Sequence, residues 1–257
     1  MNITLFTSNN KRHKYFINLL SKVSKKLYVV QENAPLTFNN QNKSKLKKKY
    51  YKKLNIAQSK FFKNNSSTIS KRNIKILSLK SGDLKNYSLE DLSDFLKSDI
   101  YILFGCSYIK GKLLDFLVKK KGISLHMGLS PYYIGSDCNF WAMYDNNPHL
   151  VGATIHYVSK KYDSGPILYH AMSKIKTSVF EYSMSTTKSC LNSLAQKIKE
   201  KSIFKLKASY LKRKEQIRNT TKEDFNDKII SNFFKRKIDL KSKDFDLNLL
   251  KNPYFLK

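Results

Sequence analysis

Residues 99–128 read DIYILFGCSYIKGKLLDFLVKKKGISLHMG, and this stretch decides the fold. The apolar run of residues 99–105 ends in glycine and is typical of a parallel strand that is buried on both faces. Residues 110–120 have the apolar spacing of an amphipathic helix, and residues 122–128 again resemble a strand. A strand, a helix and a strand in this order favour an α/β fold.

The same alternation continues outward from this stretch. Strands are expected to begin at Ile3, Lys26, Ile74, Val151 and Gly165, and helices are expected over residues 11–25, 88–97 and 178–201. The sequence therefore predicts an open, mostly parallel, Rossmann-like sheet with helices on both faces. Ligands of such sheets bind beyond the carboxyl ends of central strands. The strands that end at Gly105 and near Met127 therefore point to one cleft.

The chain divides by composition. Residues 1–202 are expected to form one domain, in which the Lys-rich stretch of about residues 33–73 is an insertion made of a solvated helix and loops. Residues 203–257 are strongly basic and show no alternating strands. We expect them to form a basic helical C-terminal extension, with a helix capped near Thr221, that packs on the domain or binds a partner.

The formal net charge of +30 would suit a nucleic acid or a membrane surface. Most of the cations are lysines, whereas base and phosphate readers favour arginine, which occurs here at Arg12, Arg72, Arg213, Arg218 and Arg236. Lys, Asn, Ile, Tyr and Phe share A/T-rich codons, so we attribute most of the charge to genome composition. We expect no nucleic-acid partner, although the charge would attract small anionic substrates.

The apolar runs and the cysteines indicate which environment suits the protein. No apolar run approaches the roughly 20 residues of a membrane span. Cys106, Cys138 and Cys190 are odd in number and widely spaced, which predicts neither a disulfide framework nor a metal site. A cytoplasmic protein is expected, and a monomer and a homodimer both stay open.

His126 stands at the end of a predicted strand, and a loop with proline and glycine follows it. A lone histidine in this place is either a structural residue or a working one. Asp163 lies in the turn YDSGPIL between two later strands and could reach back to His126. A histidine beside a partly buried aspartate forms an acid/base pair in which each group tunes the other.

Four segments, in order, resemble the folate-dependent formyltransferases, which act on glycinamide ribonucleotide, methionyl-tRNA or amino sugars. They are GISLHMGLSPYYIGS at 122–136, NFWAMYD at 139–145, VGATIHYV at 151–158 and DSGPI at 163–167. The match covers about residues 99–170, with a looser match from Ile3. Several spaced elements in the right order are far more specific than one short motif.

The resemblance implies a formyltransferase that uses 10-formyltetrahydrofolate as formyl donor and an amine as acceptor, without a metal. His126 and Asp163 match the catalytic pair, and Ser124 stands where the family has an oxyanion-binding Asn. The residues expected to bind the donor are Gly105, Cys106, Ser107, Tyr108, Ile109 and Tyr162. The residues expected to bind the acceptor are Asn9, Ser130, Pro131, Tyr132 and Gly135.

Two departures from the family pattern leave alternatives open. A serine at position 124 can still donate a hydrogen bond, but loss of one oxyanion donor costs on the order of 10²-fold in rate. The chain is therefore either a working enzyme or a catalytically weakened binding protein. Ile134 replaces an arginine of many relatives. NFWAMYD resembles the sugar-modifying branch most, so we expect a nucleotide-linked amino sugar, with a glycinamide ribonucleotide-type activity as the alternative.

Overall fold

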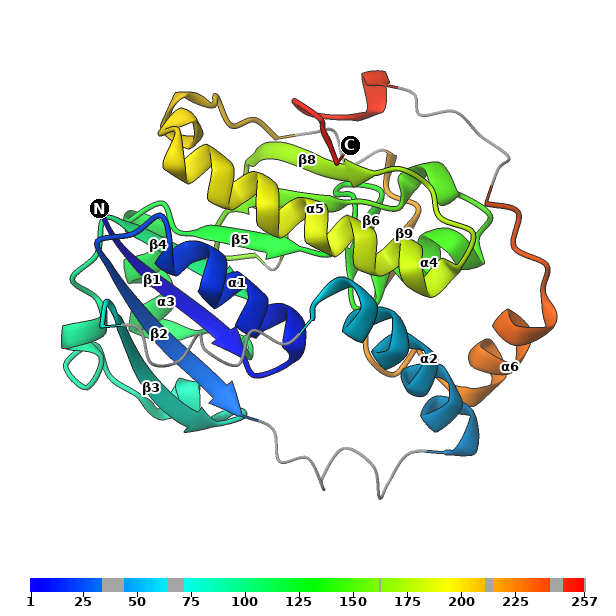
Figure 1. Ribbon diagram of the computed structural model, residues 1–257, viewed down its shortest axis with the longest axis horizontal. Helices are drawn as coiled ribbons and strands as arrows, with labels where there is room; N and C mark the ends of the chain where they lie inside the picture. The colour runs from blue at the N-terminus through cyan, green and yellow to red at the C-terminus, as the bar shows by residue number, and fades with distance from the viewer. Residues whose placement is uncertain (34–43, 64–71, 162, 211–214, 241–246, 257) are drawn as a thin grey trace.

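The computed structural model describes residues 1–33, 44–63, 72–161, 163–210, 215–240 and 247–256. In this part of the chain an eight-stranded sheet runs in the order β10-β8-β7-β5-β4-β1-β2-β3, and β7 alone is antiparallel to its neighbours (Figure 1). β6 and β9 form a small second sheet. The strands are β1 (Asn2–Ser8), β2 (Lys26–Asn33), β3 (Ile74–Lys80), β4 (Ile100–Phe104), β5 (Ile123–His126), β6 (Tyr133–Gly135), β7 (Ala153–Tyr157), β8 (Ile167–Ser173), β9 (Arg218–Thr220) and β10 (Tyr254–Leu256).

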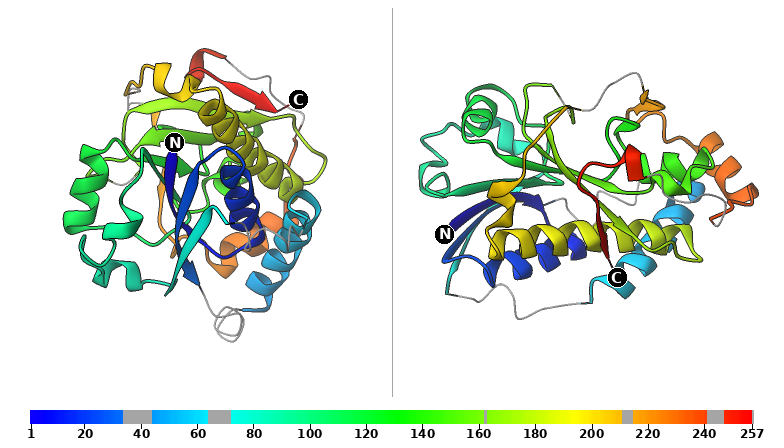
Figure 2. Two further views of the ribbon diagram at one scale, coloured as in Figure 1. Left: turned by 60° about the vertical axis from the view of Figure 1, so that its left-hand side comes forward. Right: turned by 90° about the horizontal axis from the view of Figure 1, so that it is seen from above.

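Helices cover both faces of the large sheet, as Figure 2 shows. The helices are α1 (Lys11–Ser21), α2 (Lys45–Phe61), α3 (Gly111–Lys119), α4 (Cys138–Tyr144), α5 (Val179–Lys199) and α6 (Asp227–Lys235). Short 3-10 helices span Asp83–Asn86, Ser93–Phe95, Pro148–Leu150, Ser202–Lys205 and Leu247–Leu249. α1 and α5 pack on one face, α3 packs on the other, and α2 packs beside α5.

The alternation of side chains along the central strands explains this layering. On β1, Leu5 belongs to the apolar cluster under α1 and α5, whereas its neighbour Phe6 belongs to the cluster under α3. Both side chains are fully buried. Burial of one such side chain contributes about 1.5–3 kcal/mol, so a strand that is apolar at successive positions is stable only between two layers. The predicted α/β architecture is confirmed.

The helix expected over residues 88–97 is wrong. The predicted cap forms, because the Ser88 N–H donates to Asp91 Oδ2 at 2.8 Å and the Asp91 N–H donates to Ser88 Oγ at 3.1 Å. The chain then makes a turn and the 3-10 helix Ser93–Phe95. Leu92 and Phe95 are both buried, and their spacing of three residues places them on one side of a 3-10 turn.

The Lys-rich insertion contains α2, as expected, while residues 34–43 and 64–71 lie outside the described residues. The helix begins after Ser44, whose Oγ accepts from the Lys47 N–H at 3.1 Å. The expectation of a solvated helix is only partly correct, because Tyr50 and Ala57 are buried and the helix packs against α5 and α6. The lysines occupy the remaining faces.

The C-terminal residues form more than the expected helix. α6 begins after Asn226, which caps it, and not near Thr221, whose N–H donates instead to Asp224 Oδ2 at 2.7 Å. β9 pairs with β6, and β10 adds an edge strand beside β8. Strands of three residues are too short to show an alternating pattern, so the sequence did not reveal them. Within the described part of the chain, no helix is both long and apolar enough to cross a membrane.

Candidate active site

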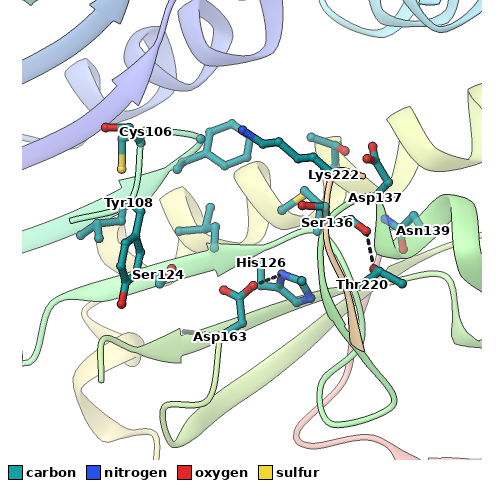
Figure 3. Close-up of a pocket in the computed structure, with 18 of the residues that line it drawn as sticks. Cys106, Tyr108, Ser124, His126, Ser136, Asp137, Asn139, Asp163, Thr220 and Lys222 are labelled. Atoms are coloured by element: carbon teal, nitrogen blue, oxygen red, sulfur yellow. Dashed lines mark hydrogen bonds and ion pairs between the residues drawn. The ribbon is translucent and has the colours of Figure 1, made fainter. Parts of the chain in front are cut away.

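A cavity of about 780 Å³ opens at the carboxyl ends of β4 and β5, which is where the sequence predicts a cleft. Its loop end is formed by residues 105–109, which follow β4. Its tail end is formed by Arg12, Asp137, Asn139 and Lys222. His126 and Asp163 lie between the two ends (Figure 3). The cavity therefore extends to both sides of His126.

Both ring nitrogens of His126 face oxygen atoms. Nδ1 lies 3.0 Å from Asp163 Oδ2, and Nε2 lies 3.0 Å from the carbonyl oxygen of Tyr133. Because the side chain is 5% exposed, burial favours the neutral ring, but Asp163 and Cys138 together outweigh burial and raise the pKa of His126 well above its usual value. Oxygen atoms beside both ring nitrogens favour the protonated imidazole, in agreement with the raised pKa.

Asp163 follows β7 in the turn that leads to β8, with a left-handed backbone of φ 45°. Burial alone would raise its pKa, but His126, and behind it His156 at 3.8 Å, lower the pKa below its usual range. Its Oδ2 atom has no partner at hydrogen-bond geometry among the described residues, so the contact to His126 is an ion pair without good alignment. Such contacts commonly tighten when a ligand closes the site.

Ser124 lies on β5, two positions before His126, so the two side chains share one face of the strand. It lines the cavity between the loop end and His126 (Figure 3). Its hydroxyl makes no hydrogen bond to any of the described residues. The hydroxyl is therefore free to donate to a ligand.

The expected donor-binding residues line the loop end, where the structure brings together Gly105, Cys106, Ser107, Tyr108 and Ile109. Tyr162 lies outside the described residues. Ile109 is buried and Tyr108 is about half exposed, so the loop presents both an apolar floor and an aromatic rim. Burial and the carboxylate of Glu32 raise the pKa of Cys106 to about 12, which leaves its thiol neutral.

The expected acceptor-binding residues are mostly elsewhere. Gly135 lines the cavity, but Asn9, Ser130, Pro131 and Tyr132 do not. Ser130 is buried, and its backbone bonds to Thr154 Oγ1 at 2.8 Å and His170 Nε2 at 3.0 Å. The hydroxyl of Tyr132 donates to the carbonyl oxygen of Leu249 at 3.0 Å. These contacts shape the loop after His126 and attach it to β7, β8 and the C-terminal residues.

The residues that form the tail end were missed by the sequence analysis. Arg12 comes from α1, Asp137 and Asn139 from the start of α4, and Lys222 from the turn after β9. Arg12 Nη1 donates to Gln58 Oε1 at 3.0 Å, and its other side-chain donors have no partner among the described residues. The sequence held no signal for this grouping, because the residues come together only through tertiary packing.

Two polar groups of the tail end are unpaired within the described chain. Asn139 is buried, and its Oδ1 accepts from the Gly152 N–H at 3.0 Å, but its Nδ2 has no partner. Asp137 makes no ion pair with any of the described residues. Desolvation raises its pKa, while the cations Arg12, Lys222 and Lys47 oppose that shift. A ligand with both donors and anionic groups would satisfy this end of the cavity.

β9 joins the C-terminal residues to the cavity wall. Thr220 accepts from the Ser136 N–H at 2.9 Å and its Oγ1 donates back to the Ser136 carbonyl oxygen at 2.8 Å. Arg218 forms a two-pronged ion pair with Asp145, with distances of 2.6 and 2.7 Å, and stacks 4.6 Å from the Trp141 ring. These contacts fix the turn that carries Lys222.

No group of three or more His, Cys, Asp and Glu side chains in the described ranges could hold a metal ion.

Solved structures with this fold come from the formyltransferases. A sugar N-formyltransferase from Shewanella is 16% identical, with a TM-score of 0.55 over 88% of this chain and 78% of that one. An N-formyltransferase from Helicobacter canadensis, in complex with folinic acid and dTDP-3-aminofucose, is 14% identical, with a TM-score of 0.52 over 91% and 79%. Phosphoribosylglycinamide formyltransferase from Anaplasma phagocytophilum is 17% identical, with a TM-score of 0.51 over 77% and 85%.

At these identities the neighbours establish the fold alone. No curated protein matches the chain. The sequence model of the formyl transferase family matches residues 19–203, which include β5, His126 and Asp163. The match covers well over half of the chain, and the protein therefore belongs to the formyl transferase family.

Proposed function

We propose that this enzyme transfers the formyl group of 10-formyltetrahydrofolate to the amino group of a nucleotide-linked sugar. The observation that carries the proposal is the buried His126–Asp163 pair in the middle of a two-ended cavity. The Helicobacter canadensis neighbour holds a folate and a nucleotide-linked amino sugar. A donor and an acceptor of these kinds suit the two ends of the present cavity.

The loop end fits a folate donor. The exposed ring of Tyr108 and the apolar side chains of Ile109 and Val158 offer contacts to a flat aromatic group, and residues 105–109 offer backbone N–H and C=O groups to its polar edge. The donor would supply the formyl carbonyl that the acceptor amine attacks. We place it with the formyl group toward His126.

His126 and Ser124 then stabilise the charge that develops on the formyl oxygen. His126 provides a fixed positive charge at the floor of the cavity, and Ser124 provides a free hydroxyl donor beside it. Asp163 keeps His126 protonated and oriented, and it assists proton transfer through water. Because Nε2 and Nδ1 both face oxygen atoms of the protein, His126 acts through its positive charge rather than as a base.

The tail end fits an anionic acceptor. The free donors of Arg12 and the ammonium group of Lys222 suit phosphate oxygens, while Asp137 and Asn139 suit hydroxyl or amide groups of a sugar or base. The turn after β1 carries no glycine, so a glycine-rich phosphate loop is missing there. Phosphate recognition through Arg12 and Lys222 would take its place.

The test is a panel of amino acceptors. The purified protein is incubated with 10-formyltetrahydrofolate and either UDP- or dTDP-linked amino sugars, glycinamide ribonucleotide, or the free amino sugars. We expect tetrahydrofolate release with a nucleotide-linked amino sugar and not with the free sugars. Turnover with glycinamide ribonucleotide alone would reject the sugar assignment. If folinic acid does not bind by calorimetry, the folate donor itself is rejected.

Ser124 separates a working enzyme from a weakened one. If the serine hydroxyl serves as the oxyanion donor, Ser124→Ala lowers kcat on the order of 10²-fold while folinic acid binding is unchanged. Ser124→Asn provides the matched comparison. A gain in kcat with Asn would show that serine is an impaired substitute, and a loss would show that this cavity is built around the shorter side chain.

A further inference from the structure

Glu32 is a buried carboxylate beside the loop end of the cavity. It lies on β2 and is 2% exposed. Oε1 accepts from the Gly82 N–H and from the Ser107 hydroxyl, each at 2.8 Å, and Oε2 accepts from the Ser107 N–H. No lysine, arginine or histidine of the described chain lies within 4 Å of it. Neutral donors alone therefore satisfy this charge.

A carboxylate in this position is costly unless its hydrogen bonds are complete. Removing a charge from water costs several kcal/mol, and charge-assisted hydrogen bonds from N–H and O–H groups offset that cost. Both Ser107 donors and the Gly82 N–H point at the same carboxylate. Glu32 thus joins the turn after β3 to the loop after β4, which are adjacent to it in space but distant in sequence.

The loop is held at two points. At its start, Gly105 has a φ of +69° and packs on the His13 ring, where a Cβ atom would lie 2.7 Å from Nε2. Two residues later, Glu32 holds both donors of Ser107. Cys106 lies between these points, and Tyr108 and Ile109 follow them. The carboxylate therefore sets the backbone path of the cavity-lining loop without lining the cavity itself.

We propose that Glu32 is a positioning residue for the formyl donor, holding residues 105–109 in the conformation that binds folate. The inference rests on the proposed function, because it takes the loop end as the donor site. The side chain contacts neither ligand. Its effect reaches the donor through Ser107, and the tail end of the cavity, where the acceptor binds, is not connected to it by any described contact.

The test compares Glu32→Gln with Glu200→Gln, the same change at an exposed site at the end of α5. Glutamine has the same shape as glutamate, but its side-chain NH2 group would face an N–H or O–H donor of Ser107 or Gly82 and could not accept from it. We expect the Kd for folinic acid and the KM for 10-formyltetrahydrofolate to rise about tenfold to a hundredfold, as for lost hydrogen bonds to a charged group. The KM for the acceptor and kcat at saturating donor should stay within twofold of the native values.

Ser107→Ala is the second variant, because it removes one donor and keeps the carboxylate. It should weaken folinic acid binding severalfold, and its effect should not add to that of Glu32→Gln. If Glu32→Gln does not fold, Glu32→Asp, which keeps the charge but shortens its reach to Ser107 and Gly82, takes its place, because Ser107 itself lines the cavity. Unchanged folinic acid affinity in the folded variants would overturn the role of Glu32, as would equal losses in donor and acceptor KM. Failure of the native protein to bind folinic acid would reject the proposed function instead.

Discussion

Asp163→Asn tests the central claim that a buried carboxylate keeps His126 charged. The substitution removes the charge 3.0 Å from Nδ1 and leaves the burial of the ring in place. Burial then dominates, so the pKa of His126 should fall from well above its usual value to below it. At neutral pH the ring becomes neutral, and kcat should fall on the order of 10²–10⁴-fold.

The same variant should be less stable. Breaking a buried ion pair costs about 3–5 kcal/mol, and this is an upper limit because the imidazole can release its proton. The raised pKa of His126 gives stability that is complete below about pH 6.5 and is lost as the pH rises through the folded-state pKa. The lowered pKa of Asp163 gives stability that is present above about pH 3.9. The difference between native and variant protein is therefore largest between those two values.

Three measurements decide this prediction. Urea unfolding at pH 5, 7 and 9 should show the gap in unfolding free energy narrowing as the pH rises. Histidine-ring NMR should show the changed titration of His126, and tetrahydrofolate release should report kcat. Asp115→Asn, at an exposed ion pair with Lys160, is the matched control and should change none of them. Near-native kcat with an unchanged His126 titration would refute the reasoning.

Further predictions concern packing, thiol chemistry and acid stability. Gly135→Ala places a Cβ atom 1.9 Å from the Thr220 carbonyl oxygen at a backbone φ of +96°. It should lower the free energy of unfolding, measured by heat or urea, by at least about 2 kcal/mol. The loss should exceed that of Gly82→Ala, which has a similar positive φ but no atom near the new Cβ. Cys106, with a pKa of about 12, should react with iodoacetamide at pH 8 at least about 10²-fold more slowly than a free cysteine, and a rate near that of free cysteine would contradict its environment. Burial lowers the pKa of His170 to about 4, so between about pH 6.5 and pH 4 the unfolded chain binds a proton that the folded chain does not. The free energy of unfolding should therefore fall by up to about 1.4 kcal/mol per pH unit over this range. His170→Gln should reduce this slope.

The sequence predicted the parts of the site that lie close together along the chain. β4, the loop of residues 105–109 and β5 follow one another, so their apolar runs located the cleft, and His126 and Ser124 came with them. Asp163 could be placed near His126 because it lies in the nine residues between β7 and β8, and β7 pairs directly with β5. Wherever a strand and its following loop supply the chemistry, a local pattern suffices.

The tail end could not be predicted in this way. Arg12 lies on an ordinary amphipathic helix, and Lys222 is one of many lysines in a basic segment, so nothing in the local sequence marks either residue. What places Lys222 in the cavity is the pairing of β9 with β6, a contact between segments that are far apart in the chain. A pairing of three residues has no detectable period, and its partner is chosen by tertiary packing.

This difference between the two ends has a functional consequence. The loop end is built from the central sheet and is held by the buried carboxylate of Glu32, so its shape is set by the core of the fold. The tail end depends on β9, which is fixed by backbone pairing and by the Arg218–Asp145 ion pair. Under the proposed function, changes in β9 and the turn after it would act on acceptor binding through Lys222, beside Arg12, Asp137 and Asn139, which come from earlier elements. The residues that follow α5 thus contribute one side of the proposed acceptor site, and the donor site lies outside them.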